Sequence, residues 1–154
     1  MAGNLKQRLI KAGRDFNYAE GVKVLNNSGG EILADVVVYA SGSSGPFITI
    51  AKADATTSTK ATGRLHITKH AIPNNGYGVV LPWKLVTGLN NDVATGGAGN
   101  EVYLAAASTG AMTTSKPSGG STVVRAIGTV VTDATGPASG DGAVLFTNDA
   151  PVLE

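Results

Sequence analysis

The sequence contains no cysteine, two histidines and one tryptophan, and only 15% of its 154 residues are charged. The absence of cysteine excludes disulfides, thiolate nucleophiles and cysteine metal sites. The longest apolar run, residues 36–40, is much shorter than the roughly 18 residues that a membrane-spanning helix needs. No apolar stretch follows the basic residues near the N-terminus, as a signal peptide would require. We therefore expect no membrane association and a chain made in the cytoplasm.

Small neutral residues take the place of the missing charges. Charged residues make up about 25% of an average domain, whereas here Gly, Ala, Ser, Thr and Val dominate. A neutral surface of small side chains loses little hydration and little rotamer entropy when another protein covers it. The composition therefore favours a protein that lives in an assembly.

The pattern from about residue 18 onward is typical of an all-β domain. Short β-branched runs alternate with clusters of Gly, Pro, Ser, Asn and Asp, which supply tight turns. We predict an antiparallel β-barrel or β-sandwich of about ten short strands, and we see no repeat of fixed period. Strands are expected at residues 22–25, 36–40, 47–53, 64–68, 77–82, 84–89, 101–105, 111–114, 123–132 and 143–147.

Alternating apolar residues identify the expected core. Leu65 and Ile67 alternate with polar neighbours, and so do Val102 and Leu104, so one face of each strand should be buried. Residues 101–114 are expected to form a hairpin of small side chains around a turn at residues 108–110. The full set of predicted core residues is Tyr39, Phe47, Leu65, Ile67, Val79, Leu81, Val102, Leu104, Val130 and Phe146.

The N-terminal region differs in charge from the rest of the chain. We assign residues 1–27 to an extended or partly helical arm and residues 28–154 to the β-rich domain. The first 23 residues carry a net charge near +3, and the remainder is near −2. A basic arm suits an acidic protein surface or nucleic acid. The basic residues are Lys6, Arg8, Lys11, Arg14 and Lys23, against Asp15 and Glu20.

The residues that could carry chemistry are not arranged for it. His66 and His70 would share one face of a helix, but on the expected strand they lie about 13 Å apart, too far for one metal ion. No G-x-S-x-G elbow and no phosphate-binding loop motif occurs, and most acids stand beside turn residues. We predict no enzymatic activity, no cofactor and no metal site; a loop-bound ion at Asp133 or Asp141 is the one alternative left open.

Several patterns together resemble a known family. They are GEILADVVVY at residues 30–39, IAKA at 50–53, ATGRLHI at 61–67, GLN at 88–90, GNEVYL at 99–104, VRAIGTV at 124–130 and VLF at 144–146. Over about residues 28–150 the chain is similar to the small β-rich head decoration, or cement, proteins of tailed bacteriophages. The resemblance consists of strand and turn patterns and includes no catalytic signature.

The resemblance implies a structural virion protein. Such a protein would sit on the capsid exterior, commonly as a homotrimer, and stabilise contacts between capsomers of the major capsid protein without catalysis. By analogy with the arms of cement proteins, the arm would contact the capsid or a neighbouring subunit, and we expect Lys6, Arg8, Lys11 and Arg14 to contact the capsid. The basic residues of the β region are scattered and lack interleaved aromatics, so no specific nucleic-acid binding is expected.

The main alternative is a binding module. A phage tail-fibre or host-attachment domain would hold a surface glycan, and Tyr77 and Trp83 would supply the aromatic platform. Trp83 follows a run of apolar residues, so a position in the core or at a subunit interface is its ordinary interpretation. A hydrolase ranks third, because its motifs are missing.

Overall fold

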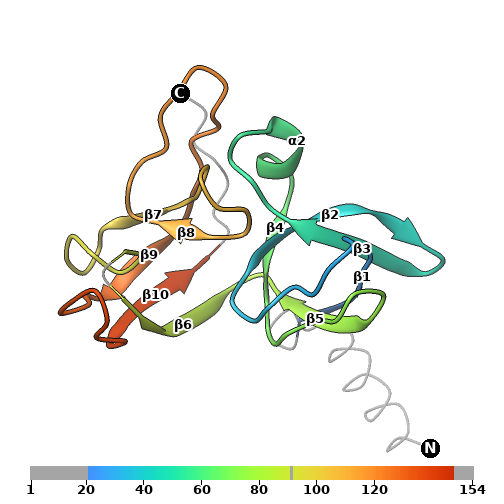
Figure 1. Ribbon diagram of the computed structural model, residues 1–154, viewed down its shortest axis with the longest axis horizontal. Coiled ribbons are helices and arrows are strands. Elements are labelled where there is room, and N and C mark those ends of the chain that lie inside the picture. Colours follow the sequence, from blue (N-terminus) through green and yellow to red (C-terminus); the bar gives the residue numbers. More distant parts are fainter. Residues whose placement is uncertain (1–20, 91, 148–154) are drawn as a thin grey trace, which may run out of the picture.

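The computed structural model describes residues 21–90 and 92–147, and its fold is nearly all β, as the sequence predicts. Two five-stranded sheets lie side by side (Figure 1). The first contains β1 (Val22–Asn26), β2 (Val37–Ser44), β3 (Phe47–Lys52), β4 (Leu65–Thr68) and β5 (Tyr77–Leu81). The second contains β6 (Lys84–Leu89), β7 (Glu101–Leu104), β8 (Met112–Thr113), β9 (Ala126–Thr132) and β10 (Gly142–Phe146), and a single helical turn, α2 (Ser58–Ala61), follows β3.

The first sheet closes into a barrel with the strand order β1-β3-β2-β4-β5. Most neighbours are antiparallel, but β1 runs parallel to β3, with Val24 opposite Ile48. β1 lies within residues 1–27, which the sequence analysis assigned to the arm. This part of the expected arm is therefore a strand of the barrel. The helix expected near the N-terminus lies outside the described residues.

The second sheet is antiparallel throughout, in the order β6-β10-β9-β7-β8. The predicted hairpin at residues 101–114 is confirmed, because β7 pairs with β8 through Tyr103 and Thr113. The strand expected from residue 123 begins only at Ala126. Val123, where the strand was expected to begin, instead bonds to the segment that follows β3. Its amide donates to the Ala55 carbonyl at 2.7 Å.

One hydrophobic core joins the two sheets. Leu65 and Ile67 on the outside of the barrel belong to one buried cluster with Val144 and Phe146 from the inner face of the second sheet. Seven of the ten predicted core residues are buried, whereas Tyr39, Phe47 and Val79 are half-buried. A second cluster, composed of Val24, Ile32, Val38, Ile50, Ile72 and Val80, fills part of the barrel interior.

The β7–β8 turn fastens the second sheet to the barrel. The Gly110 amide donates to the Ala53 carbonyl at 2.6 Å, and the Val37 amide donates to the Gly110 carbonyl at 2.8 Å. Gly110 has a φ of 77°, and a Cβ atom at this position would collide with Val36 Cγ1. Glycine is therefore required both for the backbone conformation and for the close approach.

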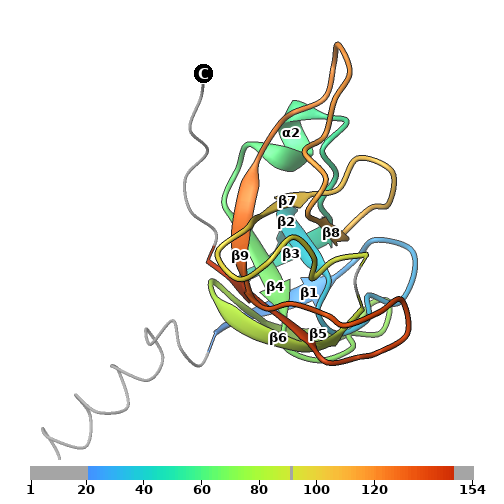
Figure 2. The ribbon, with the colours of Figure 1, turned by 90° about the vertical axis from the view of Figure 1, so that its left-hand side faces the viewer.

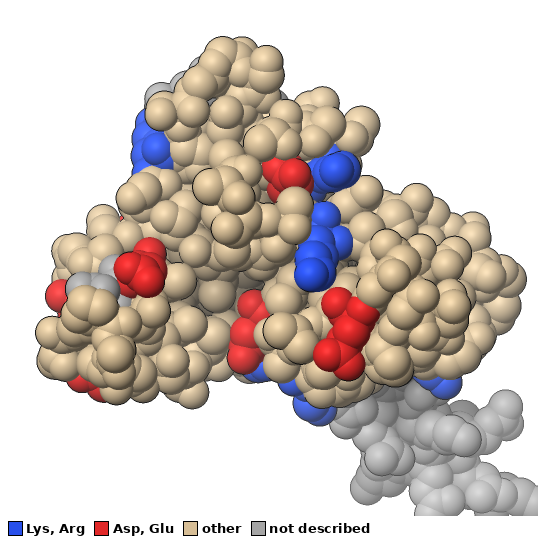
Figure 3. All heavy atoms as spheres, in the orientation of Figure 1, with Lys and Arg blue, Asp and Glu red and all other residues tan. Residues whose placement is uncertain are grey.

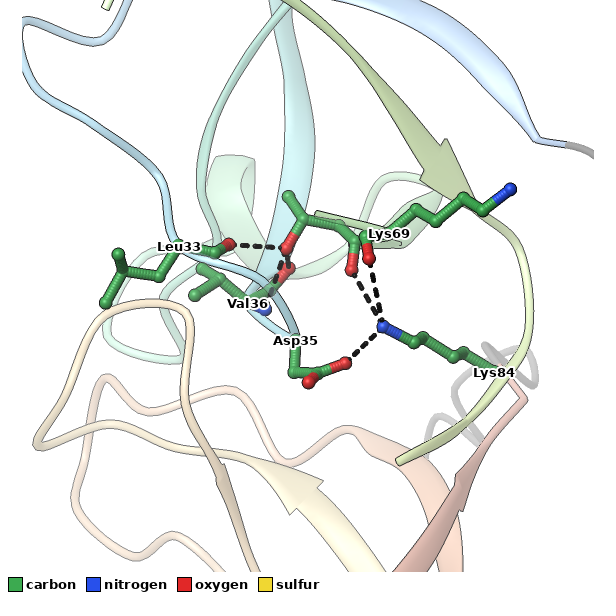
Figure 4. Close-up of polar contacts among 6 residues, drawn as sticks. Leu33, Asp35, Val36, Lys69 and Lys84 are labelled. Atoms are coloured by element: carbon green, nitrogen blue, oxygen red, sulfur yellow. Dashed lines mark hydrogen bonds and ion pairs between the residues drawn. The ribbon is translucent and has the colours of Figure 1, made fainter. Parts of the chain in front are cut away.

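Lys84 makes a second connection between the sheets (Figure 4). Its Nζ atom, at the start of β6, lies 2.5 Å from Asp35 Oδ1 in the loop before β2. Nζ also donates to the carbonyls of Thr68 and Lys69 at 3.4 and 3.3 Å. The Thr68 hydroxyl in turn donates to the Leu33 carbonyl at 2.7 Å, so the same cluster holds the loop against β4.

Two loops of the barrel, between β1 and β2 and between β4 and β5, share backbone features. Ile32 and Ile72 form an antiparallel bridge, and each is followed three residues later by a residue with positive φ, Asp35 at 61° and Asn75 at 58°. This similarity is hard to see in the sequence because the two loops share backbone geometry and few side chains.

Candidate functional site

The outward side of the second sheet is a partly apolar surface on which most side chains are uncharged. The strand register places Leu85, Leu145 and Thr129 in one row across β6, β10 and β9. Thr87 follows on β6, and Val131 lies at the bulge of β9. We call Leu85, Thr87, Thr129, Val131 and Leu145 the outer face; Figure 2 views the molecule from the side of this sheet.

Two apolar side chains of the outer face are about half exposed. Leu85 is 50% exposed and Val131 is 47% exposed, whereas the alternate residues Val86, Val130 and Val144 are buried in the core. The row of Leu85 continues to Glu101 on β7, whose carboxylate accepts a hydrogen bond from the Tyr103 hydroxyl at 2.6 Å. This bond raises the pKa of Tyr103.

Neutrality makes this surface suitable for contact with another protein. The two aliphatic side chains would leave water on binding, and the short threonine side chains between them have little rotamer entropy to lose. On the side of the molecule shown in Figure 3, uncharged residues make up most of the surface. The sequence shows the neutral composition, but only the strand register shows which side chains share the face.

The basic residues expected to contact a capsid, Lys6, Arg8, Lys11 and Arg14, lie outside the described residues. The two aromatic residues of the glycan alternative are described and exposed, Tyr77 at 51% and Trp83 at 54%. Tyr77 begins β5, and Trp83 follows its end, so a strand of about 16 Å separates them. They do not form one platform for a single sugar ring.

Tyr77 belongs instead to an aromatic and cationic cluster outside the barrel. Its ring centroid lies 4.7 Å from that of Phe47, with the planes tilted by 59°. The Lys23 ammonium lies 5.2 Å from the Tyr77 centroid and 5.5 Å from the Phe47 centroid. These cation–π contacts explain why Phe47, predicted as a core residue, is half-buried at the surface.

The two histidines have separate environments. His66 lies on β4 and is half-buried, and burial, with a smaller effect of the Arg64 charge, lowers its pKa. His70 is exposed, and its Nδ1 lies 2.9 Å from the Ala71 carbonyl oxygen. Within residues 21–90 and 92–147, no group of three or more His, Cys, Asp or Glu side chains is arranged to hold a metal ion.

Several carboxylates have local structural roles. Asp54 Oδ1 accepts hydrogen bonds from the Thr56 hydroxyl and amide at 2.6 and 2.7 Å, which lower its pKa. Asp141 accepts bonds from the Thr135 hydroxyl and amide at 2.7 and 3.1 Å. Hydrogen bonds from Ser139 and Thr135 lower the pKa of Asp141 to about 2. These bonds account for the positions of both acids within their turns.

A pocket of about 240 Å³ opens at one end of the barrel. Aliphatic side chains from β1, β2, β3 and β5 form most of its wall, and His66 and Arg64 complete it on the side of β4. Sequence analysis missed this pocket. Alternating valines on β1 were the only local signal, and the pocket exists because distant strands meet around it.

No protein-family model, curated protein or solved structure matches the chain. None of the helices among the described residues has the length and hydrophobicity to cross a membrane.

Proposed function

We propose that this protein is a structural component of a bacteriophage virion that binds the outer surface of the capsid and stabilises contacts between capsomers without catalysis. Its partners are the major capsid protein and further copies of itself, most simply as a homotrimer. It would be made in the host cytoplasm and reside on the capsid exterior.

The outer face is the observation that carries this proposal. Leu85 and Val131 are about half exposed on a sheet whose other side contributes Val86, Val130 and Val144 to the core. We assign the outer face as the capsid-binding surface, because burying it removes apolar area from water and strips few charges of hydration. The family resemblance of residues 28–150 suggests the partner, and the exposed apolar side chains of the outer face support the choice of surface.

The proposed role follows from simple mechanics. Packed DNA pushes capsomers apart, and a bound trimer opposes this movement because separation must also break its own contacts. A trimer binds at several points, so modest individual contacts add up through effective concentration. The basic residues Lys6, Arg8, Lys11 and Arg14 would add an electrostatic contact to an acidic capsid surface.

A binding experiment with matched variants tests the assignment. Purified protein is mixed with expanded, undecorated phage capsids, and co-sedimentation gives the bound fraction. Leu85→Glu and Val131→Glu should each weaken binding by about tenfold or more, because a carboxylate would be buried at the interface. Leu33→Glu is the control, since Leu33 is 59% exposed but lies in the loop before β2.

The mass of each variant decides what a loss of binding means. Light scattering should show that Leu85→Glu keeps the oligomeric state of the wild type. If the variant dissociates, the outer face is a subunit interface and its assignment to the capsid is wrong. If the wild-type protein does not bind capsids at all, the proposed function itself is wrong.

Trp83 favours a second candidate function, a tail-fibre or host-attachment module that binds a surface glycan. Its indole is 54% exposed immediately before β6, where a sugar ring could stack on it. A glycan array distinguishes the two functions. A glycan module would bind a defined sugar, and the Trp83→Ala variant would lose this binding. A decoration protein would bind capsids and no sugar.

A further inference from the structure

The open end of the barrel forms an apolar pocket with a single polar side. The aliphatic lining consists chiefly of Val22, Val24, Val38, Ile48, Ile50 and Val80. These residues come from β1, β2, β3 and β5, so four strands contribute to one wall. The volume of about 240 Å³ exceeds the roughly 150 Å³ of a dry apolar cavity that binds benzene.

The opposite end of the barrel interior is filled by side chains. Ile32 and Ile72 are both fully buried, and their backbones form an antiparallel bridge between two loops of the barrel. They belong to one cluster with Val24, Val38 and Val80, which also line the pocket. The pocket therefore has an apolar floor, and its aliphatic walls would lose water if a ligand entered.

The polar side of the pocket comes from β4. Val38 lies opposite His66 in the β2–β4 register, so the imidazole shares the inward face with Val38. Arg64 precedes His66 by two residues and also lines the pocket. The lowered pKa of His66 keeps its imidazole neutral near pH 7, so Arg64 supplies the only formal charge among the lining residues.

We propose that this barrel mouth binds a small monocarboxylic acid with one aromatic ring, of the size of 3-phenylpropionate. The ring would lie among the valine and isoleucine side chains. The carboxylate would face Arg64, whose guanidinium can donate two parallel hydrogen bonds, and His66, whose imidazole can donate one. Binding is noncovalent and goes beyond the proposed structural role.

The geometry favours a free acid over the end of a peptide. Peptides commonly bind by adding a strand to an exposed sheet edge, where main-chain hydrogen bonds hold them. Each strand around this pocket pairs with two neighbours in the barrel, and among the described residues unpaired edges are limited to strand ends, such as β2 beyond its last pair with β4, Tyr39 with Leu65. A compact ligand needs only the apolar walls and one anchor for its charge.

A titration of the full-length protein tests the proposal. Methyl NMR spectra follow the valine and isoleucine methyl groups while 3-phenylpropionate is added, with 3-phenylpropan-1-ol as the neutral analogue. The acid should shift the methyl signals of Val22, Val38, Ile48 and Val80, with a dissociation constant on the order of 1 mM. Methyl groups in the second sheet, such as those of Val144, should not move.

Two variants separate the apolar and the charged parts of the site. Arg64→Gln should weaken binding of the acid about tenfold and leave binding of the alcohol unchanged. Ala40→Phe should abolish binding of both compounds, because the ring would enter the mouth from an exposed rim position. Thermal unfolding verifies that each variant is folded.

Each remaining outcome overturns the proposal. Wild-type protein that shows no shifts with either compound has no ligand site at the barrel mouth. Equal loss of acid and alcohol binding in Arg64→Gln, or no loss of either, removes the assignment of a carboxylate. Neither result bears on capsid binding, which is measured separately.

Discussion

Ile32 and Ile72 exchange two backbone hydrogen bonds and so join the loop before β2 to the loop before β5. The Ile32 amide donates to the Ile72 carbonyl at 3.0 Å, and the Ile72 amide donates to the Ile32 carbonyl at 2.7 Å. Two further backbone hydrogen bonds connect the same two segments on either side of this pair. The Asn26 amide donates to the Gly76 carbonyl at 2.9 Å, and the Thr68 amide donates to the Val36 carbonyl at 3.0 Å. The segments β1–loop–β2 and β4–loop–β5 therefore meet at this pair, and β3 completes the barrel between β1 and β2.

Truncation of either isoleucine should destabilise the protein strongly. Both side chains are fully buried, so Ile32→Ala and Ile72→Ala should each lower the free energy of unfolding by about 2–5 kcal/mol. The double variant should lose less stability than the two single variants together, because both truncations would enlarge the same cavity. Urea unfolding measures the effect. Leu33→Ala, at an exposed neighbour, should change stability by less than about 0.5 kcal/mol.

Gly110→Ala should weaken the attachment of the second sheet to the barrel. A positive φ costs alanine about 1–2 kcal/mol, and overpacking against Val36 adds about 1–3 kcal/mol. Gly45→Ala is a matched control, because Gly45 also has a positive φ, of 57°, but has open space around it. Urea unfolding should show a larger loss for Gly110→Ala. Equal losses would mean that the close approach contributes nothing.

Stability should fall as the pH decreases below about 6.5, partly because of His66. Burial lowers its pKa below the ordinary value of 6.5, so the unfolded chain binds a proton that the folded chain excludes. Stability from this group is present above pH 6.5 and is lost as the pH falls toward the lower folded pKa.

The two histidines provide their own comparison. Thermal unfolding between pH 5 and pH 8 should show a shallower pH dependence for His66→Gln than for the wild type. His70→Gln should retain the wild-type dependence, since His70 is exposed. A steeper or unchanged slope in His66→Gln would contradict the assigned cause.

Charge reversal of the basic N-terminal residues should reduce capsid occupancy. Replacement of Lys6, Arg8, Lys11 and Arg14 by glutamate would repel an acidic capsid surface and should lower binding most at low salt. Co-sedimentation at two ionic strengths measures this effect. Full occupancy at both would show that these residues do not contact the capsid.

The purified protein should be a trimer. Light scattering should give about three times the 15.5 kDa mass of one chain. A concentration series separates a stable trimer from a weak association. A mass of one chain at all concentrations would remove the trimer from the proposal and leave the fold unaffected.

Local chemistry made the strands predictable. Leu65 and Ile67 are buried on β4 as their alternation indicates, and turn residues separate most strands at the expected places. The start of β9 was less predictable. Val123 and Val124 have strong strand propensity, but Val123 bonds to the barrel side through Ala55 instead of extending the ladder.

The amino-acid sequence by itself determined the all-β class, the turn positions, the neutral composition and the scarcity of catalytic residue types. These properties depend on a few neighbouring residues or on composition alone. The tertiary structure alone decided the parallel pairing of β1 with β3, the bridge between Ile32 and Ile72, the membership of the outer face and the barrel mouth around His66. These features arise where segments far apart in the chain meet, and their free energy comes from packing the whole domain.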